Sequence, residues 1–316
     1  MAKSIKSLRL TKKSIKVKIG YLLIICLIFN FEINTRAQTS CDFIKNVRAF
    51  QNSVKLIEHP GDESKVPEVD TTSFNINVYM SLFNRLKVDS GKVCCLIGLY
   101  DNRAGGPLLY AKDKNFNEEE YISRKISEAN ERIDSTISQN ILKYKRGNFS
   151  EEQINKMIRF YEYLKRSYDR TYALIIYARD PGNKLCNNLI PDGSQEGYLQ
   201  YLFFNQMGEQ FALFWHSYYG EKTVLCNKMD VEYFIRYYKE RKEYFEYDEN
   251  KIRDLLNSDL SPAVELDSTN CTIRWYEIYT HGGIYKNTYT IERSYPFRVK
   301  NIVSEQIATI SPKFLY

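Results

Sequence analysis

Three side chains in the C-terminal part of the sequence have the types needed for acid–base or metal chemistry. His216 lies in a run of aromatic and branched residues, Glu277 lies in a second such run, and His281 follows it directly before two glycines. Alternation along the strand expected over residues 271–280 puts Glu277 in phase with His281. Two imidazoles and one carboxylate that converge would suit a zinc site or an acid–base pair. This pattern allows a hydrolase, with or without zinc.

The same residues also have a simpler structural interpretation. A histidine in an aromatic strand usually packs in the core beside a hydrogen-bonding neighbour, and His216, Glu277 and His281 match no local ligand spacing. The chain contains no G-x-S-x-G, H-E-x-x-H or C-x-x-C motif, and His59 is the only histidine besides His216 and His281. We therefore assign no catalytic residue, cofactor or metal, and favour a non-catalytic protein over the hydrolase.

Aromatic residues around the same strand end favour a binding surface. Trp275 and Tyr279 share the face of Glu277, and the turn His281-Gly282-Gly283 follows the strand. Such rings stack on sugars, although aromatic residues in a β-rich region more often belong to the core. A helix packed on a curved antiparallel sheet often leaves a concave pocket. We expect His281, Tyr279 and Trp275 at the rim of that pocket.

The first 37 residues have the composition of a secretory signal peptide. Residues 1–20 hold seven basic groups and no acid, and residues 21–29 are an unbroken apolar run. The run is shorter than the roughly 20 apolar residues that span a bilayer, and Thr35-Arg36-Ala37 fits a cleavage site. We expect an exported protein, periplasmic, in the cell envelope or secreted, that contacts the membrane only through this segment before cleavage. A retained anchor is the alternative.

The basic character of the chain belongs to that segment. Residues 1–37 hold eight of the 45 basic residues and one of the 39 acidic ones, so their removal changes the net charge from +6 to −1. A mature chain with this charge offers no basic surface for nucleic acid. The partners that remain are a small molecule, a glycan or another envelope protein.

Six of the seven cysteines follow the predicted cleavage site: Cys41, Cys94, Cys95, Cys186, Cys226 and Cys271. An even number in an exported protein is compatible with disulfides, in any of fifteen pairings. Cys94 and Cys95 would point to opposite faces of a strand and so bond different partners. Buried thiols are the alternative, because a chain of this size folds without cross-links. Lipidation of Cys41 is disfavoured because Glu32 and Arg36 separate it from the apolar run.

Residues 38–190 form the helix-rich half of the mature chain. Apolar spacing predicts helices over 41–58, 74–86 and 118–145, a further helix from Ser150 to Leu164, and buried strands over 92–100, 108–111 and 172–178. Asn117 and Gly147 would bound the longest helix, and Ser150 with Gln153 forms a capping box. The short link between these two helices predicts an antiparallel helical hairpin beside a small sheet.

Residues 191–316 form the half with the antiparallel sheet, either as a second domain or as part of one continuous domain. Runs 198–205 and 210–219 read as a β-hairpin turning at Gly208, with the second run as a central strand. Further patterns predict helices over 230–241 and 249–256 and strands over 263–266, 271–280, 284–293, 299–303 and 306–310. The fold class is thus α+β, with a curved antiparallel sheet packed on helix 230–241.

One resemblance covers residues 198–316. The run LFFNQMGEQFALFWHSYYGEKTVLC, followed by CTIRWYEIYTHGGIYKNTYTIER, resembles exported hypothetical proteins of Bacteroidetes, and the signal ending at Ala37-Gln38 is similar to theirs. The resemblance implies residence in the cell envelope and supplies no functional residues. We therefore expect an exported binding or interaction module, with the hydrolase as the alternative.

Overall fold

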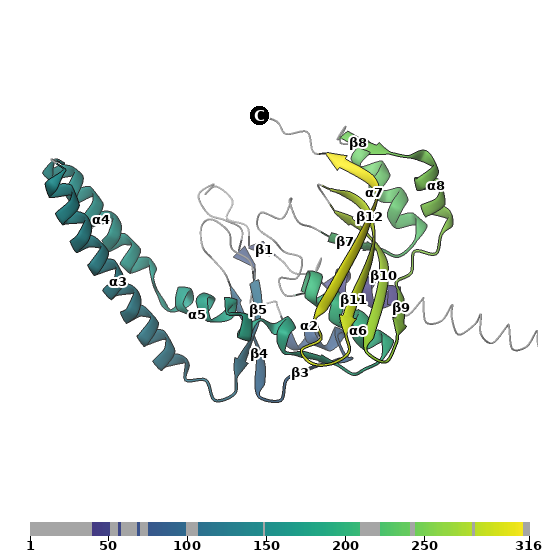
Figure 1. Cartoon of the computed structure of the whole chain (residues 1–316), viewed down its shortest axis with the longest axis horizontal. Coiled ribbons are helices and arrows are strands. Elements are labelled where there is room, and N and C mark those ends of the chain that lie inside the picture. The colour runs from purple at the N-terminus through teal and green to yellow at the C-terminus, as the bar shows by residue number, and fades with distance from the viewer. Residues whose placement is uncertain are drawn as a thin grey trace, which may run out of the picture.

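A computed structural model describes residues 40–50, 56–57, 68–69, 75–98, 107–147, 149–208, 222–240, 244–279 and 282–311. Figure 1 shows a body that is built around an antiparallel sheet. A long helical hairpin projects from the side of the molecule opposite to this sheet. Helices and strands both contribute heavily, so the chain is α+β, as predicted. None of the described helices is long and apolar enough to cross a bilayer.

The central sheet is antiparallel throughout, with the strand order β7-β10-β11-β12-β8. Its strands are β7 (Lys222–Leu225), β8 (Tyr244–Tyr247), β10 (Asn270–Tyr279), β11 (Gly283–Glu292) and β12 (Val299–Ser311). A further strand, β9 (Ala263–Leu266), pairs with the first half of β10 on the edge where β7 pairs with the second half. The predicted hairpin of β10 and β11 is confirmed, whereas β12 is one strand where two were predicted.

Helices cover both faces of this sheet. The side chains of β10 alternate between the two faces, and each face belongs to a separate hydrophobic cluster that helices complete. Cys271, Ile273 and Trp275 pack with the helix at residues 40–50, with α2 (Ile76–Leu82) and with α6 (Gln195–Phe203). Ile278 points to the other side. It packs with α7 (Lys228–Glu240) and α8 (Glu249–Asn257), so the predicted packing of the sheet on helices is confirmed.

The predicted helical hairpin is confirmed in α3 (Glu118–Arg146) and α4 (Glu151–Ser167). The Asn117 side chain caps α3 by accepting from the Glu120 N–H, and Ser150 and Gln153 form the predicted capping box of α4. Ion pairs such as Lys165 Nζ with Asp134 link the two helices. We call this hairpin the arm.

Three two-stranded sheets accompany the central sheet in the part of the chain that the structure describes. They pair β1 (Leu56–Ile57) with β2 (Glu68–Val69), β3 (Leu86–Val88) with β6 (Leu189–Pro191), and β4 (Lys92–Gly98) with β5 (Pro107–Asp113). Short 3-10 turns at Pro181–Asn183 and Leu185–Asn188 precede β6. Cys94 and Cys95 do face opposite sides of β4, since they pack against different hydrophobic clusters.

Two predicted strands are helices in the structure. The run 172–178 lies in α5 (Arg170–Arg179), which Asp169 caps, and the run 198–205 lies in α6 and the π-helical turn Phe204–Gly208. Neither run shows helical periodicity, because residues 198–204 are buried on every side and the run 172–178 is apolar on its exposed side as well, at Tyr172 and Ile176. The second run of the predicted hairpin, 210–219, lies outside the described residues.

Two other predictions need correction at their boundaries. The helix predicted over 41–58 is observed at residues 40–50, and residues 56–57 form β1 instead. The helix predicted over 74–86 is confirmed over the shorter span of α2, and Leu86 already belongs to β3. Strands β7 and β8, of four residues each, were not predicted.

Candidate functional site

The structure places one of the three predicted acid–base residues, Glu277, deep in the body. Glu277 is 2% exposed although it lies on β10 near the end of the sheet. His59, His216 and His281 lie outside the described residues. Of the predicted rim residues, Tyr279 is half-buried and Trp275 is 1% exposed, which places Trp275 in the core.

Two aromatic donors hold the Glu277 carboxylate. The indole Nε1 of Trp275 donates to Glu277 Oε2 at 2.9 Å, and the Tyr289 hydroxyl donates to the same oxygen at 3.3 Å. Tyr289 comes from β11, and its ring meets that of Trp275 edge-on with centroids 5.2 Å apart. The ring contact fixes the two donors, and the donors fix the carboxylate.

A lysine approaches the carboxylate from the edge of the sheet. Lys222 is the first residue of β7, and its Nζ lies 3.9 Å from Glu277 Oε1. The same Nζ donates to Gln206 Oε1 at 3.0 Å and lies 5.0 Å from the centroid of the Tyr279 ring. Lys222 therefore connects the buried carboxylate to the π-helical turn that carries Gln206. Such turns are frequent at functional sites.

Burial dominates the electrostatics of Glu277. Loss of solvent raises the pKa of its carboxyl, and the charge of Lys222 with hydrogen bonds from Trp275, Tyr289 and Asn287 only partly opposes that rise. Burial and the nearby Glu277 charge also raise the pKa of Tyr289. A buried carboxyl with a raised pKa is a candidate proton donor, although structural networks show the same shift.

Asn287 adds an unsatisfied acceptor to this network. It is buried on β11, and its Oδ1 has no hydrogen-bond partner among the described residues. An unpaired buried acceptor costs on the order of 1–3 kcal/mol. A donor such as water or a ligand N–H would be stabilised at this position. We call the following six residues the Glu277 cluster: Gln206, Lys222, Trp275, Glu277, Asn287 and Tyr289.

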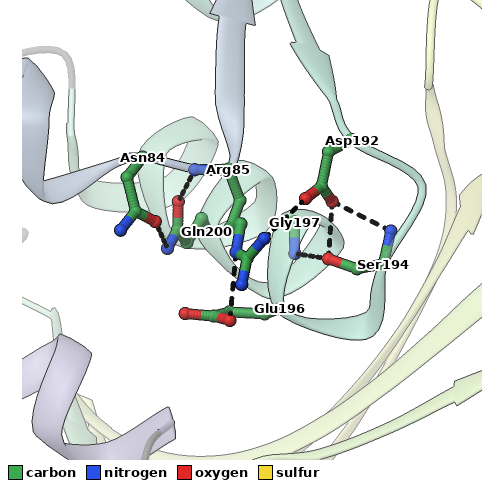
Figure 2. Close-up of polar contacts among 7 residues, drawn as sticks. All are labelled: Asn84, Arg85, Asp192, Ser194, Glu196, Gly197 and Gln200. Carbon is green, nitrogen blue, oxygen red and sulfur yellow. Dashed lines mark hydrogen bonds and ion pairs between the residues drawn. The ribbon is translucent and has the colours of Figure 1, made fainter.

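A second polar network fixes α6, which precedes the π-helical turn (Figure 2). Arg85 lies between two carboxylates, with its Nη1 3.4 Å from Asp192 and its Nε 3.3 Å from Glu196. The buried Gln200 side chain accepts from the Arg85 backbone N–H at 2.9 Å and donates to Asn84 at 3.2 Å. These contacts join α6 to the start of β3 and so position the turn that carries Gln206.

The N-terminus of α6 is closed by the same network. Ser194 caps the helix by accepting from the Gly197 N–H, and its own hydroxyl and N–H donate to Asp192. Burial alone would raise the pKa of Asp192, but the bonds from Ser194 and the charge of Arg85 outweigh it and lower that pKa. The polar groups of this network around α6 are paired with one another, which indicates that the network has a structural role.

The chemistry available to the Glu277 cluster is limited. It contains one carboxylate, so it does not supply the pair of acids used in glycoside hydrolysis. The part of the chain that the structure describes contains no group of His, Cys, Asp or Glu residues able to hold a metal ion. Sequence reasoning found Glu277 through strand phase but missed Lys222, Gln206 and Asn287, which come from unpredicted elements or from ordinary polar positions.

The arm presents a different kind of surface. Half of the exposed large apolar side chains in the described residues lie on the arm, its connecting turn or the following helix α5. They are Leu142, Phe149, Phe160, Tyr163, Tyr172 and Ile176. No residue of α4 is buried, and α3 buries only Ile122. Sequence reasoning predicted these helices but not that their apolar residues would stay uncovered.

The fold and the two sites define an α+β protein with a buried polar cluster and a projecting helical arm. No family model, curated protein or solved structure matches the chain.

Proposed function

We propose that this protein is an exported, non-catalytic interaction module whose arm binds another protein of the cell envelope. The observation that carries the proposal is the uncovered aromatic surface of the arm, where Phe160 and Tyr163 are 56% and 60% exposed. Export rests on the signal-peptide pattern of residues 1–37, which also supports the formation of disulfides in the mature chain.

The geometry of the arm explains why this surface is free to bind. Two antiparallel helices cover only one side of each other, and the arm projects from the body, so no described element packs on its outer face (Figure 1). Phe160 and Tyr163 are three positions apart on α4 and therefore share one face of it, and neighbouring exposed apolar residues indicate an interaction site. Tyrosine and other large aromatic residues also dominate the binding energy of protein interfaces. A protein partner therefore fits this surface better than a small molecule, which prefers a concave site.

Site-specific photo-crosslinking in the envelope of the host tests the proposal. A photoreactive residue at Tyr163 should give one dominant protein adduct, whereas the same residue at Tyr233, which is 52% exposed on α7 of the body, should not. Added wild-type protein should compete for the adduct. The double variant Phe160→Ser/Tyr163→Ser should fail to compete, while Tyr233→Ser should compete as well as wild type. Equal cross-linking at both positions would contradict an arm-specific interface.

The Glu277 cluster favours one other candidate, a hydrolase that uses Glu277 with His216 and His281. The observation behind it is the raised pKa of the Glu277 carboxyl beside the unpaired Asn287 Oδ1. Turnover of ester, peptide and glycoside substrates that is lost in Glu277→Gln would support the hydrolase. The same turnover in wild type and Glu277→Gln would exclude Glu277 as its acid or base.

A further inference from the structure

Two cysteines that are far apart in the sequence meet in the body. Cys41 lies in the helix at residues 40–50, and Cys226 directly follows β7, 185 positions later. No bond joins their thiols in the structure, where they lie 2.9 Å apart, and the Cys41 thiol donates to the Cys226 carbonyl with an Sγ to O distance of 3.7 Å. Non-bonded heavy atoms rest about 3.5–4.0 Å apart. The thiols are thus closer than ordinary packing requires.

Other contacts hold the two backbones in this arrangement. The Arg48 guanidinium, on the same helix as Cys41, donates to the Val224 carbonyl of β7. The Cys226 N–H donates to Asp230 Oδ2 at 2.8 Å, which fixes the turn between β7 and α7. Each cysteine is 6% exposed, and both belong to the cluster that covers one face of the sheet. The approach of the thiols therefore does not depend on a bond between them.

We propose that Cys41 and Cys226 form a disulfide in the exported protein and that this bond fastens the helix at residues 40–50 to β7. The inference rests on the proposed export, because structural disulfides persist in oxidising compartments and are rare in the cytosol. It names one bridge and leaves four thiols, whereas each of the fifteen complete pairings of six cysteines would need three bridges. The cross-link joins the start of the mature chain to the strand that carries Lys222.

The bond forms by thiol–disulfide exchange with a disulfide donor, either a small-molecule disulfide or a disulfide oxidoreductase of the compartment. The thiolate of one cysteine attacks one donor sulfur, forms a mixed disulfide and releases the other donor sulfur as a thiolate. The thiol of the other cysteine then loses its proton and attacks the Sγ of the first, which forms the new S–S bond and releases the second donor thiolate. The two cysteines lose two electrons and two protons, and the donor becomes two thiols.

Contact between the two thiols changes both pKa values in the folded protein. The interaction with the Cys226 thiol, together with Ser261 and Lys45, lowers the pKa of Cys41 against the opposing effect of burial. The same pair interaction and burial raise the pKa of Cys226. Because both groups are buried once the helix docks, the exchange takes place during folding, before these shifts apply, and either thiol can attack first.

The remaining cysteines of the mature chain, Cys94, Cys95, Cys186 and Cys271, are free thiols in the structure. Cys94 and Cys95 face opposite sides of β4, so their thiols point away from each other. Burial raises the pKa of Cys94 and that of Cys271 to about 12. We expect these four cysteines to remain thiols.

Peptide mapping of the full chain recovered from the envelope of its host tests the pairing. The protein is denatured and alkylated without reductant, then digested with and without reduction. We expect one cross-linked species that joins the Cys41 and Cys226 peptides and disappears on reduction, while Cys94, Cys95, Cys186 and Cys271 are alkylated directly. Alkylation or lipidation of Cys41 in that sample would overturn the proposal.

Variants separate the pairing from the stability of the fold. The unfolding midpoint of wild type should fall when reductant is added, and the midpoint of Cys94→Ser should fall by the same amount. Cys41→Ser/Cys226→Ser should show no shift with reductant. A shift of the same size in this double variant would assign the redox sensitivity to another pair.

Refolding of the denatured, reduced protein in the presence of oxidised glutathione separates this proposal from the proposed export. A Cys41–Cys226 link that forms in the purified protein, but is absent from a protein found in the cytosol, would mean that export fails and the pairing stands. Free thiols in a protein recovered from the envelope would mean that the pairing fails and export stands.

Discussion

The indole N–H of Trp275 donates a 2.9 Å hydrogen bond to the carboxylate of Glu277, two positions further along the same face of β10. One strand thus supplies both a buried charge and a donor that stabilises it. The Tyr289 hydroxyl and Lys222 complete the surroundings of that charge. Such a network is costly to break because each partner is left unsatisfied inside the protein.

The pH dependence of stability should reveal the buried carboxyl. The folded-state pKa of Glu277 is raised above its ordinary value of 4.5, so the folded protein binds this proton more tightly than the unfolded chain does. The contribution of Glu277 to stability is therefore largest below about pH 4.5 and is lost as the pH rises through the folded-state pKa. Glu277→Gln removes this titration. In urea unfolding between about pH 4 and 8, the stability of Glu277→Gln relative to wild type should increase as the pH rises. A difference in unfolding free energy that stays constant with pH would contradict the burial effect.

The shape of the Glu277 side chain should matter separately from its charge. Glu277→Ala leaves the Trp275 N–H and the Tyr289 O–H without an acceptor, at a cost of about 1–3 kcal/mol for each buried donor. Glu277→Gln keeps an oxygen in this position. At pH 7 the alanine variant should therefore be less stable than the glutamine variant by at least about 1 kcal/mol in urea unfolding.

The capping box of α4 should determine how firmly the arm is held. Ser150→Ala removes the acceptor for the Gln153 N–H and should destabilise the arm by about 1 kcal/mol. Hydrogen exchange of α4 amides should become faster by roughly fivefold, since about 1.4 kcal/mol corresponds to tenfold, while exchange in β10 and β11 stays unchanged. Ser167→Ala, at the other end of α4, keeps both partners of the box and serves as the control. Equal acceleration in the central sheet would show that the arm does not open independently.

The aromatic surface of the arm should be dispensable for folding. Phe160→Ser/Tyr163→Ser changes two exposed side chains, so the free energy of unfolding should change by no more than about 1 kcal/mol. Tyr79→Ala, in the core, should cost about 3–5 kcal/mol by comparison. Denaturant unfolding of purified proteins measures both. A large loss of unfolding free energy in the arm variant would mean that these rings stabilise the fold. A binding defect of that variant could then result from unfolding and would not identify an interface.

The turn between β10 and β11 should tolerate only glycine at one position. Gly283 has a φ of +126°, and a Cβ there would overlap the carbonyl of Ala308 on β12. Gly283→Ala should cost at least about 3 kcal/mol, because it combines backbone strain with a disrupted strand pair. Gly91→Ala is the matched control, since its Cβ would lie 3.5 Å from Asp89 Oδ1, an ordinary contact. Thermal unfolding that affects both variants equally would contradict this placement.

Local signals predicted the elements that have one polar side or a distinct boundary. Asn117, Ser150 and Gln153 marked the helices of the arm because caps are read from a few neighbouring residues. Alternation marked β10 and β11 and placed Trp275 and Glu277 on one face, as observed. The phase of a strand is a property of the sequence alone.

Elements that are apolar on every side could not be assigned in the same way. Burial on every side of α6, and apolar residues on both the buried and the exposed sides of α5, remove the periodicity that separates a helix from a strand, so only the caps Asp169 and Ser194 held the information. Lys222 reaches Glu277, and Gln206 reaches Lys222, through contacts between distant parts of the sequence, which composition and spacing do not encode. The uncovered side of α4 likewise depends on where the arm projects, and not on its own pattern.

The arm leaves the body and returns to it through β5 and α5, which contact each other. Its longer helix has 29 residues and therefore a length of about 43 Å. The connecting turn after Gly147 is thus far from the sheet in space, while the entry and exit points of the hairpin stay close together (Figure 1). A fluorescent domain inserted after Gly147 would be displayed at that distance without changing the path of the chain through the body, which makes this turn a natural attachment point for an imaging label.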